Sequence, residues 1–267
     1  MQGRLERPIR VVMFGGGPRL THDARRFLCR LEDHPEIELA GAFCQGESRT
    51  VGAILADLWR RRGLLAIPLF IDWVLQEAWR YVRFPGRELA MRQTLRRISD
   101  RLHFVRDIHA AAVLEQVRAL DPDLGLIYGS PILKPDLFEI PGLGTFGIHH
   151  GKVPAYRGNK TTFWAMYNGE PAAGVTIQKI NAGLDTGRIV LEGEVPIGSR
   201  SYGAVWRDLE SLGLDLYIQA ILRAKEGTAV YRPQAGPKGK LYRNPGPGEM
   251  LRFWSRQLKK RLLRSQG

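Results

Sequence analysis

The sequence predicts an α/β fold with a mostly parallel, twisted sheet and helices on both faces. Two observations predict it. Short apolar runs with β-branched residues, beginning with residues 9–14, alternate with stretches of helical periodicity. The first run ends in Gly15, Gly16 and Gly17 and is followed by a helix-like segment, the β-turn-α opening of a parallel unit.

The other elements follow in order along the chain. Strands are expected at residues 37–43, at 102–105, in a segment ending near Gly129, from about Gly144, and at 174–180 and 187–197. Helices are expected at residues 21–31, 108–120, 161–166 (a short helical turn), 202–225 and 250–263. These alternations support one large domain rather than a string of repeats.

The predicted domain organisation has two parts. Residues 1–231 form one domain, interrupted at about 50–98 by a helical insertion, and residues 232–267 form an extended Pro- and Gly-rich tail with a basic C-terminal helix. The insertion carries aromatic side chains among arginine clusters, including Arg60, Arg61, Arg62, Arg92, Arg96 and Arg97. Such a pattern indicates a membrane or nucleic-acid surface, or more often core aromatics backed by solvated arginines, which is the interpretation we favour.

The composition limits the class of protein. The 267 residues carry 40 Lys and Arg against 27 Asp and Glu, a net charge of +13, which favours anionic partners or a well-solvated surface. Only two cysteines are present, so neither a disulfide framework nor a Cys-rich zinc site is expected. With no signal-like segment and no sufficiently long apolar window, a cytoplasmic location is expected.

The polar residues that could carry chemistry gather between residues 129 and 187. His149 ends a predicted strand, and Asp185 lies in a second turn between Gly183 and Gly187. A carboxylate that orients an imidazole suits general acid–base chemistry. Metal binding is disfavoured, because adjacent histidines do not easily present both rings to one ion, and no metal is predicted. The Gly15–Gly17 turn reads GGGPRL, which departs from the dinucleotide-binding fingerprint.

Residues 149–190 resemble the catalytic core of the 10-formyltetrahydrofolate-dependent formyltransferases. The resemblance rests on P-x-Y-R-G at residues 154–158, the spacing from Gly169 to GVTI beginning at Gly174, and LDTG at residues 184–187, in order and at family-like separations. Weaker similarity covers the first strand and residues 121–133, and the insertion is not covered. The resemblance implies the Rossmann-like fold of that family, with 10-formyltetrahydrofolate as formyl donor.

The resemblance also implies roles for individual residues. His149 matches the histidine that stabilises the tetrahedral oxyanion, and Asp185 matches the aspartate that keeps this histidine charged and helps remove a proton from the amine. The folate pterin is expected against two backbone segments, which here contain Tyr128, Gly129, Ser130, Ile132 and Leu133, and Ile180, Asn181 and Gly183. The acceptor is expected to meet Gly15, Gly16, Lys152, Tyr156 and Arg157, with the turn amides facing an anionic group.

One residue departs from the family pattern. The family has Asn-x-His where this chain has Gly147-Ile148-His149, so an amide that donates to the oxyanion is missing. One such donor is typically worth roughly 3 kcal/mol of transition-state stabilisation. His150, Asn159 and Lys160 are the candidates for a substitute donor.

The layout resembles amino-sugar N-formyltransferases, whose short tail has a Tyr-Arg-x-Pro-like stretch, compared here with residues 242–245. We therefore expect an N-formyltransferase acting on an amine of a small anionic acceptor, such as a nucleotide-linked or lipid-linked amino sugar. The alternatives are a methionyl-tRNA formyltransferase-like enzyme, a formyltetrahydrofolate hydrolase-like enzyme, a transferase of another acyl group, and a non-catalytic binding protein. Nucleic acid is the less favoured partner, contact with the inner face of an anionic membrane is a subsidiary expectation, and the oligomeric state is not predicted.

Overall fold

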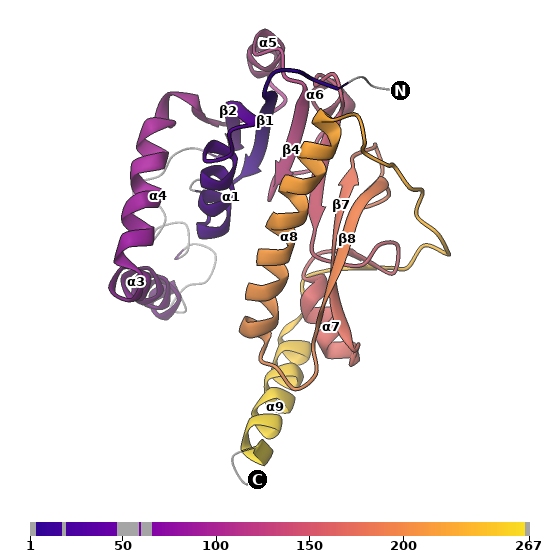
Figure 1. Ribbon diagram of the computed structural model, residues 1–267. Coiled ribbons are helices and arrows are strands. Elements are labelled where there is room, and N and C mark those ends of the chain that lie inside the picture. Colours follow the sequence, from indigo (N-terminus) through magenta and orange to yellow (C-terminus); the bar gives the residue numbers. More distant parts are fainter. Residues whose placement is uncertain (1–3, 18–19, 47–58, 60–65, 265–267) are drawn as a thin grey trace. The chain divides into compact units, whose positions relative to one another are not determined.

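The computed structural model describes residues 4–17, 20–46, 59 and 66–264 (Figure 1). It has the expected mixed α/β class, with helices and a mostly parallel seven-stranded sheet. The chain divides into two compact units. The N-terminal unit comprises Arg10–Pro122 and Tyr128–Leu133, and the C-terminal unit comprises Met1–Ile9, Asp123–Ile127 and Lys134–Gly267.

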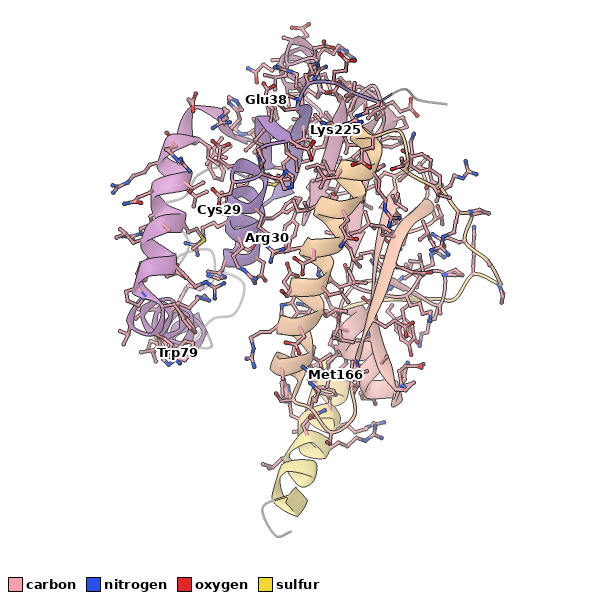
Figure 2. The ribbon with its side chains drawn as sticks, viewed as in Figure 1. Cys29, Arg30, Glu38, Trp79, Met166 and Lys225 are labelled. Atoms are coloured by element: carbon pink, nitrogen blue, oxygen red, sulfur yellow. The ribbon has the colours of Figure 1, made fainter. Side chains whose placement is uncertain are left out.

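The N-terminal unit contains strands in the order β3-β2-β1, and β2 pairs with β3 in parallel. Its elements are β1 (Ile9–Gly16), α1 (His22–Glu32), β2 (Ile37–Gln45), α3 (Ala66–Arg83), α4 (Pro85–Arg97), a 3₁₀ turn (Ser99–Arg101), β3 (Leu102–Val105) and α5 (Ala111–Ala119). Thr21 caps α1, because its hydroxyl accepts the Ala24 amide proton. Trp79 on α3 is largely exposed (Figure 2).

The C-terminal unit contains strands in the order β4-β5-β7-β8 and a second, two-stranded sheet of β6 and β9. Strand β4 is parallel to β5, whereas β7 runs antiparallel to both β5 and β8. Its elements are β4 (Leu124–Tyr128), α6 (Pro135–Phe138), β5 (Thr145–His149), β6 (Tyr156–Gly158), α7 (Thr161–Asn168), β7 (Ala172–Lys179), β8 (Arg188–Pro196), α8 (Tyr202–Lys225), β9 (Lys240–Tyr242) and α9 (Pro247–Arg264).

Helix α8 lies along β7 and β8 and supplies much of the core of the C-terminal unit (Figure 1). The fully buried Tyr217 donates its hydroxyl proton to the carbonyl of Phe146 at 2.7 Å, and its oxygen accepts the Ile127 amide at 2.9 Å. At Gly213 a Cβ atom would lie 2.9 Å from Ile148, so the glycine lets α8 approach β5 closely. The helix therefore packs tightly against the strand that ends at His149.

Strand β5 presents different residues to its two sides, because successive side chains of a strand point to opposite faces. Ile148 and Phe146 meet Gly213 and Tyr217 of α8. Gly147 and His149 therefore belong to the other face. Their partners on β7 are Gln178 and Thr176, which share that face.

The observed elements agree with the expected order to within a few residues at each end. The tail is more structured than an extended segment, because β9 pairs with β6 and Arg232 forms a bridge with Ile189. Residues on both sides of position 231 belong to the C-terminal unit, and the division of the chain there stays a prediction. Of the helical insertion, α3 and α4 are seen, whereas residues 50–58 and 60–65, with the Arg60–Arg62 cluster, lie outside the described residues.

Candidate active site

The structure brings His149 and Asp185 together from the end of β5 and the turn between β7 and β8. The His149 Nδ1 atom lies 3.4 Å from Asp185 Oδ1, and both side chains are largely buried. The Nε2 atom of the same ring lies 2.8 Å from the carbonyl oxygen of Tyr156. Both ring nitrogens thus face acceptors, so a substrate oxygen can reach Nε2 only by displacing the Tyr156 carbonyl.

The Asp185 carboxylate is held by several donors. Its Oδ2 accepts the Gly158 amide proton at 2.7 Å, and its Oδ1 accepts from Gln178 Nε2 at 3.4 Å. The backbone of Asp185 is in the left-handed region, with φ of 49°, which is uncommon for a residue other than glycine. This turn conformation is what points the carboxylate back toward β5.

The electrostatics of His149 are a balance of opposing effects. Burial lowers the pKa of the ring, whereas the Asp185 carboxylate and the hydrogen bond to the Tyr156 carbonyl raise it. His150 and Arg157 lower the pKa further by charge repulsion. The net direction is downward, so the permanently charged histidine implied by the family resemblance is not what this environment favours. Protonation depends on how closely Asp185 is held.

The segment that follows His149 closes over its ring. At Gly151 a Cβ atom would lie 2.6 Å from His149 Nε2 and 2.6 Å from the Tyr156 carbonyl oxygen, so only glycine fits without a shift. Buried Thr176, the cross-strand partner of His149, donates its hydroxyl proton to the Gly151 carbonyl at 2.9 Å. The sequence motif H-H-G therefore includes a glycine whose small size permits the contact between ring and carbonyl.

The space beside Gly147 is apolar. A Cβ atom there would lie 2.7 Å from Cδ1 of Ile180, so this isoleucine occupies the room that an asparagine side chain would need. On the neighbouring strand, Gln178 pairs with Gly147 and is 3% exposed. Its Oε1 is buried and has no hydrogen-bond partner within the described part of the chain. Sequence reasoning missed Gln178, because only the register of β5 and β7 places it opposite Gly147.

His150 has a different environment from His149. Its Nε2 lies 2.6 Å from Oε2 of the buried Glu210, and its ring packs on Trp206 with centroids 4.7 Å apart. Both partners belong to α8. This placement commits the ring to the helix face of the sheet and argues against the substitute-donor role considered for it.

Asn159 and Lys160, the other candidate donors, are exposed at the start of α7. The backbone N–H of Asn159 donates to the carbonyl of Tyr242 at 2.9 Å, and Lys160 has a left-handed backbone at the N-cap position. No hydrogen bond joins either side chain to the His149–Asp185 pair among the contacts of the described residues. Their assignment as donors stays a prediction without structural support.

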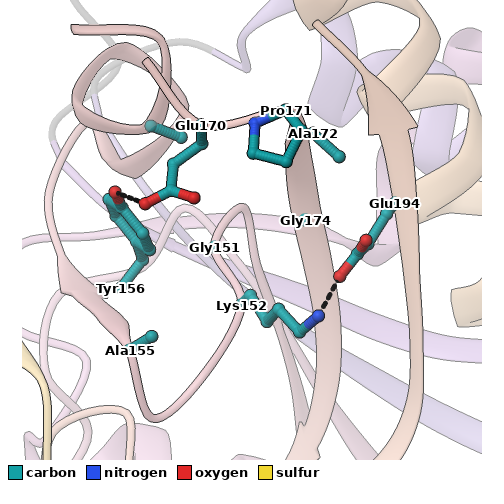
Figure 3. Close-up of a pocket in the computed structure, with 10 residues that line it drawn as sticks. Gly151, Lys152, Ala155, Tyr156, Glu170, Pro171, Ala172, Gly174 and Glu194 are labelled. Atoms are coloured by element: carbon teal, nitrogen blue, oxygen red, sulfur yellow. Dashed lines mark hydrogen bonds and ion pairs between the residues drawn. The ribbon is translucent and has the colours of Figure 1, made fainter. Parts of the chain in front are cut away.

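A cavity of about 180 Å³ is bordered by the segment that follows His149, including Gly151, Lys152 and Tyr156 (Figure 3). Lys152 and Glu194 form an ion pair at its wall, and the Tyr156 hydroxyl donates to Glu170 Oε1 at 2.6 Å. Burial and the bond to Glu170 raise the pKa of Tyr156. The expected acceptor residues Lys152 and Tyr156 thus have side chains in this cavity, next to two carboxylates.

Arg157 lies at the turn that carries Asp185 rather than in the cavity. Its guanidinium donates to the carbonyl of Leu184 at 2.6 and 3.2 Å. In the same turn, Asn181 Oδ1 accepts from the Gly183 amide and the Thr186 hydroxyl. Three residues of this unit were expected to bind the pterin of the formyl donor. Of these, Asn181 and Gly183 shape the turn, and Ile180 fills the space next to Gly147.

The other residues that were expected to contact the formyl donor or the amine acceptor belong to the N-terminal unit. Tyr128 is buried and stacks on Phe27, and Ser130 donates to the Pro131 carbonyl at 2.7 Å. Leu133 is buried and Ile132 is exposed. A Cβ atom at Gly16 would lie 2.7 Å from the carbonyl oxygen of Gly129, so the two glycines allow a close approach of two loops. Beside them is a cavity of about 40 Å³, bounded also by Gly15.

Among the described residues, no cluster of three or more His, Cys, Asp or Glu side chains is arranged to hold a metal ion. Nor does that part of the chain contain a helix with the length and apolar character needed to cross a bilayer.

Comparison with known proteins identifies relatives of the chain. The family model described as "Formyl transferase" matches residues 89–221. Methionyl-tRNA formyltransferase of Ruminiclostridium cellulolyticum is 36% identical over 124 residues, which is 45% of this chain and 39% of the relative. The same enzyme of Thermodesulfovibrio yellowstonii is 33% identical over 126 residues, which is 46% of this chain and 41% of the relative. The chain spans about two fifths of the length of these relatives.

Solved structures support the fold. Glycinamide ribonucleotide transformylase 1 from Symbiobacterium toebii has a TM-score of 0.58 at 18% identity, covering 86% of this chain and 95% of the other. A sugar N-formyltransferase from a Shewanella species has a TM-score of 0.57 at 13% identity, covering 88% of this chain and 76% of the other. The fold and the matched core define a formyltransferase-type α/β protein. The chain belongs to the formyltransferase superfamily.

Proposed function

We propose that this protein transfers a formyl group from 10-formyltetrahydrofolate to an amine. The observation that carries the proposal is the contact between His149 and Asp185, formed within the segment that the family model matches. A buried imidazole with a carboxylate at 3.4 Å can take up and return a proton, which formyl transfer requires. A formyltetrahydrofolate deformylase from Pseudomonas syringae also shares the fold, with a TM-score of 0.57.

The chemistry follows from the groups in the pair. The amine nitrogen attacks the formyl carbon, and the carbon–oxygen double bond becomes an oxyanion. The Asp185 carboxylate accepts the proton that the amine loses. The bond between the formyl carbon and N10 of the folate then breaks, and N10 takes that proton back from Asp185, which leaves tetrahydrofolate and the formamide. His149 stabilises the oxyanion once Nε2 exchanges the Tyr156 carbonyl for the substrate oxygen.

We also propose that Gln178 supplies the amide that Gly147 lacks. Three observations support it: Gln178 pairs with Gly147 across the sheet, its side chain lies on the face of His149, and its Nε2 is within 3.4 Å of Asp185. A carboxamide in this position has a second N–H available for a developing oxyanion. This assignment replaces the candidates His150, Asn159 and Lys160.

For the acceptor, we propose an amine on a small anionic molecule, such as a nucleotide-linked or lipid-linked amino sugar. The net charge of +13 favours an anionic acceptor, and the likeness to a sugar N-formyltransferase makes an amino sugar a reasonable first choice. The curated relatives of the core are named as methionyl-tRNA formyltransferases, which makes initiator tRNA the acceptor to compare.

A single assay tests these proposals. Purified protein is incubated with 10-formyltetrahydrofolate and, separately, with water alone, a panel of amino-sugar nucleotides, glycinamide ribonucleotide and methionyl-tRNA, and tetrahydrofolate release is followed. We expect acceptor-dependent release with an amino-sugar nucleotide. Release with methionyl-tRNA or without any amine would indicate the tRNA-type or hydrolase-type alternative.

Absence of release under every condition, combined with tight binding of the folate, would instead indicate a binding protein. Mass spectrometry of molecules that co-purify with the protein would reveal a different acyl donor. Either result would contradict the proposed formyl transfer.

A further inference from the structure

The first inference concerns Gln234, which lies beyond the segment matched by the family model. Its Nε2 donates to the carbonyl of Asp185 at 3.0 Å and to the carbonyl of Gly187 at 2.9 Å. One carboxamide thus satisfies two backbone acceptors of the turn that carries Asp185. The two bonds use both protons of the amide nitrogen.

The segment that carries Gln234 is anchored to the edge of the sheet. Arg232 exchanges two backbone hydrogen bonds with Ile189 of β8, at 2.8 and 2.9 Å, and its guanidinium pairs with Glu192. Gln234 follows two residues later and reaches across the turn. The sheet edge therefore sets the position of Gln234 before it contacts Asp185.

The turn needs such support because Asp185 has a left-handed backbone. The peptide carbonyl of Asp185 is one of the two groups that Gln234 binds, and Arg157 binds the carbonyl of Leu184 just before it. Without Gln234, the turn can relax toward an ordinary conformation. The carboxylate would then move away from Nδ1 of His149.

We propose that Gln234 is a positioning residue that holds Asp185 against His149. The proposal rests on the proposed formyl transfer for its kinetic consequences and on geometry alone for its structural ones. The groups that act on the charge of His149 are Asp185, His150, Arg157 and the Tyr156 carbonyl. Only Asp185 among them is held in place by Gln234.

The test uses Gln234→Met, which keeps the length of the side chain and removes both donors. Arg232→Ala is the matched control, because it lies on the same segment, keeps the two backbone hydrogen bonds to Ile189, and removes only the exposed side-chain pair with Glu192. We expect Gln234→Met to lower kcat about tenfold or more with little change in either KM, and the acid limb of the pH profile to move to lower pH. Arg232→Ala should leave the rate and the profile unchanged.

A second readout requires no activity. The ring protons of His149 are titrated by NMR in both variants, and we expect the ring of Gln234→Met to bind its proton at lower pH than that of the wild type. An unchanged titration, or an equal change in Arg232→Ala, would overturn the positioning role. If the wild-type protein shows no formyl transfer, the proposed function is contradicted. The titration of His149 still tests the positioning role of Gln234.

An independent inference concerns α9. Phe253 is 1% exposed and packs against Phe163 at 4.6 Å, which anchors the helix to the C-terminal unit. Leu251, Trp254 and Leu258 are 73%, 49% and 58% exposed, and their spacing places them on one stripe of the helix. At 100° per residue, this stripe lies far around the helix from Phe253, and in Figure 1 the helix extends beyond α7.

The charge of the helix indicates what covers the stripe. Arg252 and Arg256 are exposed and lie on the side of the helix away from the stripe, and Arg256 also contacts Tyr167. The helix sequence continues with Lys259, Lys260, Arg261 and Arg264, and Glu249 in the first turn is its only acidic residue. An apolar stripe on a helix whose polar residues are mostly Lys and Arg is the pattern of helices that lie in the surface of an anionic membrane.

We infer that α9 docks on an anionic lipid surface through Leu251, Trp254 and Leu258. The test is sedimentation of the full chain with vesicles of phosphatidylcholine, with and without phosphatidylglycerol, at low and high salt. Wild-type protein should sediment with the anionic vesicles, more at low salt, and the triple change of these residues to Ser should abolish sedimentation. Val230→Ser with Leu241→Ser, which alters exposed apolar residues elsewhere, is the matched control.

Three results would overturn this inference. The first is sedimentation that the triple substitution leaves unchanged. The second is a dimer in solution that the same substitution dissociates, because the stripe would then bind a second copy of the chain. The third is binding of RNA in place of vesicles at equal salt.

Discussion

The two adjacent histidines at the end of β5, His149 in the strand and His150 just after it, have different surroundings. Each ring faces a carboxylate: His149 Nδ1 lies 3.4 Å from Asp185, and His150 Nε2 lies 2.6 Å from Glu210. Asp185 belongs to a turn that backbone and side-chain amides hold, whereas Glu210 is part of α8 and is almost wholly buried. A His–carboxylate pair alone therefore does not identify a site.

The two His–carboxylate pairs differ in what surrounds each imidazole ring. The His149 ring is bordered by Gly151 and by the Tyr156 carbonyl, so a substrate oxygen reaches Nε2 by replacing one carbonyl contact. His150 is packed by Trp206, and its carbonyl accepts the hydroxyl protons of Thr161 and Thr162. We infer that the His150 pair stabilises the packing of α8, whereas the His149 pair carries out the chemistry.

The largest expected effect comes from removing charge in each pair separately. Asp185→Asn should lower kcat by about 10²- to 10⁴-fold, because the imidazole loses the carboxylate that orients it. Glu210→Gln should leave kcat within about twofold of the wild type. Tetrahydrofolate release at saturating donor measures both. Equal losses in the two variants would contradict the division of roles.

The next effect is on stability and concerns the His150 pair. Glu210→Ala leaves His150 facing a buried cavity without its partner, and we expect a loss of about 3–5 kcal/mol in the free energy of unfolding. Urea denaturation followed by circular dichroism measures it. Glu192→Ala breaks the exposed pair with Arg232 and should cost no more than about 1 kcal/mol. A small effect at Glu210 would show that the pair is dispensable for packing.

A third prediction addresses the missing asparagine. Gln178→Met conserves volume and removes the carboxamide, and we expect kcat to fall roughly a hundredfold with folded structure retained. Adding Gly147→Asn to the Gln178→Met variant, together with Ile180→Ala to make room, should recover part of the lost kcat. Full activity of Gln178→Met would exclude the carboxamide from the reaction.

The smallest effect is a pH dependence of stability. Because burial lowers the pKa of His149 below its unfolded value near 6.5, the unfolded chain binds more protons than the folded one as pH falls through this value. The free energy of unfolding should therefore decrease on acidification, by at most about 1.4 kcal/mol per pH unit from this group, until the folded pKa is reached. His149→Asn should show a shallower dependence. Urea denaturation from pH 7.5 to 5 measures the difference.

Several features of the site were accessible from sequence. Strand ends and the Gly-rich turns follow from local patterns, because periodicity and turn chemistry act over a few residues. The pairing of His149 with Asp185 was indicated by the family resemblance, because no local pattern joins residues so far apart in the chain. The absence of an asparagine at Gly147 was also visible there. The assignment of substitute donors was not, because it depends on which strands are neighbours and in which register.

The sequence by itself determined an α/β core of the formyltransferase type, with one histidine at a strand end and one aspartate in a glycine-rich turn. The tertiary structure decided which carboxylate each histidine meets, since His149 ends β5 facing the Asp185 turn, whereas His150, just after the strand, packs against Glu210 and Trp206 of α8. It also brought Gln178 opposite Gly147 and Gln234 onto the Asp185 turn. Those contacts join residues 31 and 49 positions apart, respectively, and only the packing of strands and segments specifies such distances.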